Sequence, residues 1–164
     1  MLIEPTIVQR DEQPYLGRRE SVTMTSFGEV ADHLPGLFGW LDEHGAVPSG
    51  PPFFRYRVID MAATQVVEAG IPVERAVQSD GQVFAGVLPA GRYASVSHVG
   101  HPDELMGVTG ELLDWGRQQG LRWDMTPTPE GEEWGCRLEV LMTNPAQEPD
   151  MHKWQTVLMF RLAD

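Results

Sequence analysis

The chain contains a single cysteine, Cys136, among its 164 residues. One cysteine excludes an intrachain disulfide and makes a cysteine-based metal cluster implausible. Because Cys136 sits in an apolar strand pattern, we expect a buried, unreactive thiol. Long apolar runs are missing too, and none approaches the roughly 20 residues of a membrane span. The first five residues (MLIEP) lack the basic start and apolar stretch of a signal peptide, which favours the cytoplasm.

Basic residues are scarce, with 12 lysines and arginines against 24 aspartates and glutamates and a formal net charge of -12. A surface of this sign repels phosphate backbones, so we expect no direct binding to nucleic acid. No spare segment remains for a helix-turn-helix, because both helical stretches belong to the repeat described below. The same field attracts cations, although in many acidic proteins it serves only solubility.

Recognisable catalytic and metal-binding motifs are absent. The five histidines show no HExxH or related ligand spacing, so we expect surface histidines and no metal site. The sequence contains no GxSxG, GxxxxGK or GxGxxG motif, and we expect no cofactor. From the residues alone, an enzyme is therefore unsupported.

The most informative feature that is present is an internal repeat. Residues 37–45 (LFGWLDEHG) recur as residues 112–120 (LLDWGRQQG), so that Trp40 matches Trp115. A repeat of this length is too long for a solenoid turn, and the chain is too short for two independent domains of typical size. We therefore expect one domain over residues 1–164, built from two modules of about 1–80 and 81–164. The seam between such halves commonly forms a ligand pocket.

Each half has the pattern of a strand, a helix and two strands. The first half predicts a strand over 15–24, a helix that has a short first turn or a kink at Pro35 and ends at Gly45, and strands over 53–60 and 63–73. The second half predicts strand character over 83–99 with a break at 89–91, a helix from Pro102 to Gly120, a mobile turn over 127–131, and strands over 135–143 and 154–162. The predicted fold is α+β, with tandem βαββ repeats and pseudo-twofold symmetry.

Glu139 lies near the centre of the strand predicted over 135–143. The alternation of a strand turns it either to solvent or to the interior, and the residues alone leave both alternatives open. An inward carboxylate must be paired, protonated or available to a cationic ligand, because an unpaired buried charge is costly. Aromatic faces would favour such a ligand by roughly 0.5 to 2 kcal/mol per ring. The chain has five tryptophans, although Trp40 and Trp115 are equally explained as core anchors.

Several motifs together resemble those of GyrI-like domains, which are related to the effector-binding domains of AraC-type and MerR-type multidrug regulators. In chain order they are residues 51–56 (PPFFRY), 68–73 (EAGIPV), 87–100 (VLPAGRYASVSHVG) with 103–105 (DEL), Trp115 with Gly120, and 138–140 (LEV) with 144–145 (NP). Each motif alone is weak. The set is specific, because it covers nearly the whole chain in the family's order.

The resemblance implies an SHS2-like fold, with two helices on a curved antiparallel sheet and a pocket for lipophilic, often cationic aromatic compounds between the repeats. Glu139 matches the family's glutamate that meets the positive charge, and Tyr56 matches a pocket aromatic residue. Two positions after that glutamate the family often has an aromatic residue, and this chain has Leu141. Part of the aromatic wall must then come from elsewhere. Our candidates for that wall are Phe53, Tyr93, Trp115, Trp134 and Met142.

Three functions remain open at this stage. The leading one is a stand-alone multidrug-type binder of lipophilic aromatic cations, because the DNA-binding part of the regulators has no counterpart in this chain. The second is a hydrolase that detoxifies strained, cyclopropane-bearing aromatic compounds, in which Glu139 activates water and Tyr56 donates a proton. The third is an acidic inhibitor that binds a DNA-processing enzyme as its protein partner.

Overall fold

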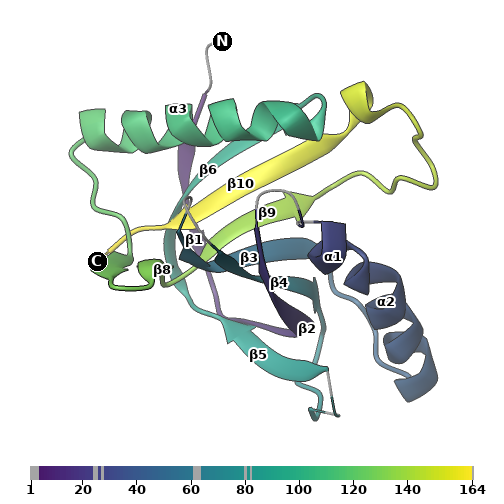
Figure 1. Ribbon diagram of the computed structural model, residues 1–164. Helices are drawn as coiled ribbons and strands as arrows, with labels where there is room; N and C mark the ends of the chain where they lie inside the picture. Colours follow the sequence, from purple (N-terminus) through teal and green to yellow (C-terminus); the bar gives the residue numbers. More distant parts are fainter. Residues whose placement is uncertain are drawn as a thin grey trace.

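The computed structural model describes residues 4–23, 26, 28–60, 64–79, 81 and 83–163. In chain order its elements are β1 (Thr6–Arg10), β2 (Gln13–Val22), α1 (Gly28–Ala31), α2 (His33–His44), β3 (Phe53–Ile59), β4 (Gln65–Pro72), β5 (Phe84–Leu88), β6 (Gly91–Val99), η1 (Pro102–Glu104), α3 (Leu105–Gln118), β7 (Met125–Thr128), β8 (Gly131–Trp134), β9 (Arg137–Leu141), η2 (Met151–Lys153) and β10 (Gln155–Arg161). The strands form one sheet in the order β1-β6-β10-β9-β3-β4-β2-β5, and the β7–β8 hairpin pairs with β3 (Figure 1).

The sheet is strongly curled, and the chain connections explain why. Strands β1 and β2 are joined by only Asp11 and Glu12, yet they lie near opposite ends of the strand order. Strands β5 and β6 are joined by Pro89 and Ala90 and are equally far apart in that order. A two-residue link reaches only about 10 Å. The two ends of the sheet must therefore approach each other, which produces an antiparallel half-barrel.

The two faces of this half-barrel have different cores. On the inner face, side chains from both ends of the sheet meet in one buried cluster that includes Tyr15, Leu88 and Leu138. On the outer face, α1 and α2 pack on β2 and β4, whereas α3 packs on β6 (Figure 1). The outer face therefore has two clusters, one around Leu37 of α2 and one around Leu112 of α3. The expected α+β fold with two main helices is confirmed.

The strand order carries the predicted pseudo-twofold symmetry. Without the edge strands β1 and β5, it reads β6-β10-β9-β3-β4-β2, so each βαββ repeat contributes three strands around the β9–β3 pair. Antiparallel pairing joins Phe54 of β3 to Glu139 of β9 at this centre. The seam between the repeats is thus the β9–β3 pair, and it lies between the part of the sheet under α3 and the part under α1 and α2.

The first helical stretch is interrupted before Pro35 and ends at Gly45. The expected short first turn is α1, which gives way to α2 at Asp32, three residues before Pro35. Proline has no N–H, and its ring clashes with the carbonyl four residues back, here that of Ala31. Gly45 ends α2 in the left-handed conformation, with φ of 63°, as predicted. No helix in the described ranges combines the length and apolar character that a membrane crossing requires.

Three segments differ from the sequence-based expectation. Residues 127–131 were predicted as a mobile turn; Pro129 and Glu130 do form a turn, but the residues on either side of it belong to the β7–β8 hairpin, in which Thr128 pairs with Gly131. Strand β8 then pairs with Val58 and Ile59 of β3, so tertiary pairing stabilises a segment whose local sequence favours a turn. Strand β1 and the short helix η2 were not predicted. The expected connection between β3 and β4 includes residues 61–63, which lie outside the described residues.

Candidate ligand-binding site at the seam

Glu139 and Tyr56 meet on the outer face of the β9–β3 pair. The Tyr56 hydroxyl donates a hydrogen bond of 2.7 Å to Glu139 Oε1. The alternation of β9 buries Leu138 completely on the inner face and turns Glu139 to the outer face, where Phe54 lies opposite on β3. Tyr56 also packs against both outer clusters, so it lies where the two repeats join. The structure therefore selects the inward alternative for Glu139.

The environment changes the acid–base properties of both groups. Burial raises the pKa of Glu139 above its ordinary value, whereas the hydrogen bond from Tyr56 and the charge of Arg137 act to lower it. Burial, followed by the charge of Glu139 and the hydrogen bond to it, raises the pKa of Tyr56 well above its ordinary value. Tyr56 is therefore a neutral hydrogen-bond donor near neutral pH. Glu139 takes up a proton more readily than a solvated glutamate.

Arg137 occupies the same site, and the sequence interpretation did not include it. Its guanidinium carbon lies 4.6 Å from the centroid of the Phe160 ring, 4.9 Å from that of Trp134 and 5.7 Å from that of Tyr56. These distances are within the range of cation-π attraction. Burial lowers the pKa of Arg137, while Tyr56 and Glu139 act to raise it. The sequence could have predicted that Arg137 lies beside Glu139, because residues two apart on a strand share a face.

The aromatic wall of the site comes mainly from the second repeat. Trp134 and Phe160 are almost fully buried, with ring centroids 5.6 Å apart. Trp123 packs against both, at 6.1 Å from Trp134 and 6.0 Å from Phe160. Trp115 contacts the same cluster from α3. Two predicted wall residues, Trp134 and Trp115, therefore lie in the outer cluster beside the seam, together with Phe160 and Trp123, which were not predicted.

The structure does not bring the other predicted wall residues to Glu139. Phe53 and Tyr93 lie in the inner cluster, on the opposite face of the sheet, and are almost fully buried there. Met142 follows the end of β9, and 47% of its side chain is exposed. Leu141, which stands where the family often has an aromatic residue, packs against the outer cluster around α2.

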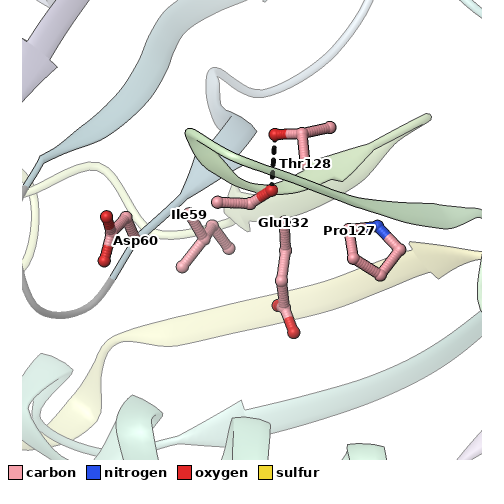
Figure 2. A pocket seen from close by; sticks show the side chains of 6 residues that line it. Ile59, Asp60, Pro127, Thr128 and Glu132 are labelled. Atoms are coloured by element: carbon pink, nitrogen blue, oxygen red, sulfur yellow. Dashed lines mark hydrogen bonds between the residues drawn. The ribbon is translucent and has the colours of Figure 1, made fainter.

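A surface hollow of about 400 Å³ opens beside the aromatic wall. Its lining, drawn in Figure 2, comprises Ile59, Asp60, Pro127, Thr128, Gly131 and Glu132. The indole N–H of Trp134 donates to Glu132 Oε1 at 3.4 Å, and the charge of Glu132 also acts on Arg137. One side of the hollow thus joins the aromatic wall. A second hollow of about 170 Å³ lies on the inner face, with Arg10 and Val140 in its lining.

A family model identifies the class of protein. The family model described as GyrI-like small molecule binding domain matches residues 3–131, which is most of the chain. The chain therefore belongs to the GyrI-like small-molecule-binding domain family. The matched range includes Tyr56 but ends before β9, so the assignment of Glu139 depends on the geometry above. No curated protein sequence matches the chain significantly.

Solved structures share the fold at low identity. The EcmrR C-terminal domain has a TM-score of 0.78 at 18% identity, with 100% of this chain and 99% of that domain covered. SAV2435 bound to tetraphenylphosphonium has a TM-score of 0.59 at 10% identity, with 98% and 94% covered. A hydrolase from Listeria innocua has a TM-score of 0.63 at 14% identity, with 98% and 92% covered. In an EcmrR–DNA complex, the likeness spans 100% of this chain but only 59% of EcmrR.

Proposed function

We propose that this domain binds lipophilic aromatic cations at the seam, where Glu139 supplies the negative charge. The observation that carries the proposal is a half-buried carboxylate whose pKa is raised by burial and which, among the described residues, accepts a hydrogen bond from the neutral hydroxyl of Tyr56. A buried carboxylate gains most from a positive charge that carries no tightly bound water, which is the property of an organic cation with aromatic substituents.

The surroundings of Glu139 support the same ligand class. The rings of Trp134 and Phe160 supply apolar, polarisable faces, and Tyr56 fixes the orientation of the carboxylate. Tetraphenylphosphonium, the ion bound by the structural relative SAV2435, is a lipophilic aromatic cation. It is therefore a suitable first probe for this chain.

The test is a titration with tetraphenylphosphonium, followed by quenching of tryptophan fluorescence. We expect Glu139→Gln to weaken binding by roughly 10- to 100-fold, because truncating a buried charge partner typically costs a few kcal/mol. Triphenylphosphine oxide, a neutral aromatic compound, should lose much less affinity. Glu43→Gln serves as the matched control, since it removes the same charge from an exposed position on α2.

Two results would contradict this proposal. If Glu139→Gln weakened the cation and the neutral compound equally, the role of Glu139 would be steric rather than electrostatic. If Glu43→Gln lost as much affinity as Glu139→Gln, the general negative field of the protein would account for binding, without a specific site.

The Glu139–Tyr56 pair also supports a second candidate function, hydrolysis. A carboxylate with a raised pKa beside a protonated hydroxyl can act as a general base on a water that attacks a cyclopropane carbon, while the hydroxyl protonates the conjugated carbonyl oxygen that takes up the electron pair of the broken C–C bond. Incubation with a cyclopropane-bearing aromatic electrophile tests this candidate. Repeated turnover that is lost in Glu139→Gln would support it, whereas stoichiometric protection without turnover would leave binding as the function.

A further inference from the structure

The aromatic surface proposed for a ligand cation is already in contact with a cation of the protein itself. Arg137 places its guanidinium 4.6 Å from the Phe160 centroid and 4.9 Å from the Trp134 centroid. A flat organic cation bound beside Glu139 would need the same ring faces, because these rings form the outer-face wall next to β9. The guanidinium and the ligand cannot both occupy those faces.

The charges of the site also indicate that a ligand cation would compete with Arg137. Arg137 and Glu139 are two residues apart on β9, and the charge of each acts on the other. With Arg137 in place, the site holds one positive and one negative group, so an incoming cation meets repulsion as well as attraction. Like charges brought together in a desolvated site cost several kcal/mol, and such repulsion is a common source of binding specificity.

We propose that Arg137 determines the charge selectivity of the site, as a resident cation that an organic cation must displace from the rings of Trp134 and Phe160. This inference rests on the proposed function, because it concerns the same site. Glu132 offers a place for the displaced guanidinium: its charge already acts on Arg137, and it lines the open hollow (Figure 2). Arg137 thereby restricts the site to cations that bind its rings better than a guanidinium does.

The experiment uses two probe ions of nearly the same shape and opposite charge, tetraphenylphosphonium and tetraphenylborate. Arg137→Met removes the charge and keeps much of the side-chain length. We expect it to tighten tetraphenylphosphonium binding by roughly 10-fold and to weaken tetraphenylborate binding by a similar factor, since the cation no longer has to displace a guanidinium from the rings and the anion loses an attractive charge. Arg137→Lys retains the charge and should change both affinities less than Arg137→Met does, although an ammonium does not stack on the rings as a guanidinium does.

Two further variants keep the test decisive. Arg75→Met removes the same charge from an exposed loop position and should leave both affinities within about 2-fold, because exposed charges are screened by salt. Arg137→Gln is a second neutral variant, which replaces Arg137→Met if circular dichroism shows that the latter is unfolded. Each variant is compared with the wild type in the same buffer.

The outcomes separate this inference from the proposed function. If the wild type binds the cation through Glu139 but the neutral Arg137 variants bind it no better, Arg137 does not set selectivity, and the proposed function stands. If the neutral variants bind both ions more tightly, they have only enlarged the site, which also overturns the inference. If neither the wild type nor any variant binds the cation, both proposals fail.

Discussion

The part of the chain that the structure describes contains two hydrogen-bonded tyrosine–glutamate pairs, one on each face of the sheet. On the outer face, Tyr56 donates to Glu139 at 2.7 Å. On the inner face, Tyr15 donates to Glu68 at 2.5 Å. The residue types are the same and each tyrosine lies on the strand that neighbours its glutamate, yet the two carboxylates differ in their remaining partners.

Glu68 is held by cations of the protein. Its side chain is fully buried, and its Oε2 accepts from Arg19 Nε at 3.1 Å and Arg19 Nη2 at 2.7 Å, with Arg57 Nε at 4.0 Å. Among the residues that the structure describes, none forms an ion pair with Glu139. Glu68 is thus paired with cations of the protein, whereas Glu139 accepts from a neutral hydroxyl, and this difference is the reason for proposing Glu139 as the partner of a ligand cation.

Glu68→Gln should give the largest effect on stability. The amide can no longer accept the charge-assisted fork of Arg19, and removing one partner of a buried pair is strongly destabilising. Because Arg19 is half-exposed, we expect the free energy of unfolding to fall by about 3 kcal/mol, the lower end of the range for buried pairs. Urea denaturation followed by tryptophan fluorescence measures it. A loss below about 1 kcal/mol, comparable to a surface change, would remove Glu68 from the role of a brace.

Tyr15→Phe should destabilise the protein by a smaller amount. The Tyr15 hydroxyl donates to Glu68 and accepts from Arg55 Nη1 at 3.1 Å, so both buried partners lose a hydrogen bond. We expect the free energy of unfolding to fall by about 1 to 2 kcal/mol. Affinity for tetraphenylphosphonium should be unchanged, because Tyr15 lies on the inner face. A clear loss of affinity in this folded variant would show that the two faces are not functionally separate.

The fold was largely predictable because its signals are local or repeated. Helical stripes ended by Gly45 and Gly120, together with the repeat of residues 37–45, gave the βαββ plan. Strand β1 was missed because it is short and exposed, and it is a strand only through its pairing with β6. The strands of the β7–β8 hairpin were missed for the same reason: Pro127 and Pro129 favour a turn, which does form at Pro129 and Glu130, but the strands beside it depend on the pairing of β8 with β7 and β3.

For the candidate site, the sequence predicted the central pair of Glu139 and Tyr56, but it did not predict which aromatic residues lie around that pair. The resemblance singled out Glu139 and Tyr56, which the structure joins by a hydrogen bond. Strand alternation alone could have separated Phe53 from Tyr56, because an odd spacing places two residues on opposite faces. Tyr93 could not be assigned in this way, since it lies on β6 and its face follows from pairing across the whole sheet. Which face the helices cover is likewise a property of the complete fold.

Glu139→Gln should change stability little, in contrast to Glu68→Gln. Folding raises the pKa of Glu139, so the folded state disfavours the ionised carboxylate. The contribution of Glu139 to the free energy of unfolding is therefore largest below the pKa of the unfolded state, about 4.3. It is lost as the pH rises through the pKa that Glu139 has in the folded state. At pH 7 the variant should equal or exceed the wild type by up to about 1 kcal/mol. Urea denaturation at pH 7 and pH 4 tests this sign; a variant less stable than the wild type at pH 7 would contradict it.

Tyr56→Phe should give the smallest effect, a shift in the pH dependence of cation binding. The Tyr56 hydrogen bond favours the ionised form of Glu139, so its removal raises the pKa of Glu139 further. Binding of tetraphenylphosphonium requires the carboxylate, and its loss on acidification should begin at a higher pH in the variant, by less than about 1 pH unit. Glu139→Gln should show no such transition and serves as the control. If the midpoint of this pH transition stayed in place or moved to lower pH, Tyr56 would contribute to the site only through its ring. The outer pair would then differ from the inner pair in two ways, because its hydroxyl would have no role and because its carboxylate has no ion-paired arginine among the described residues.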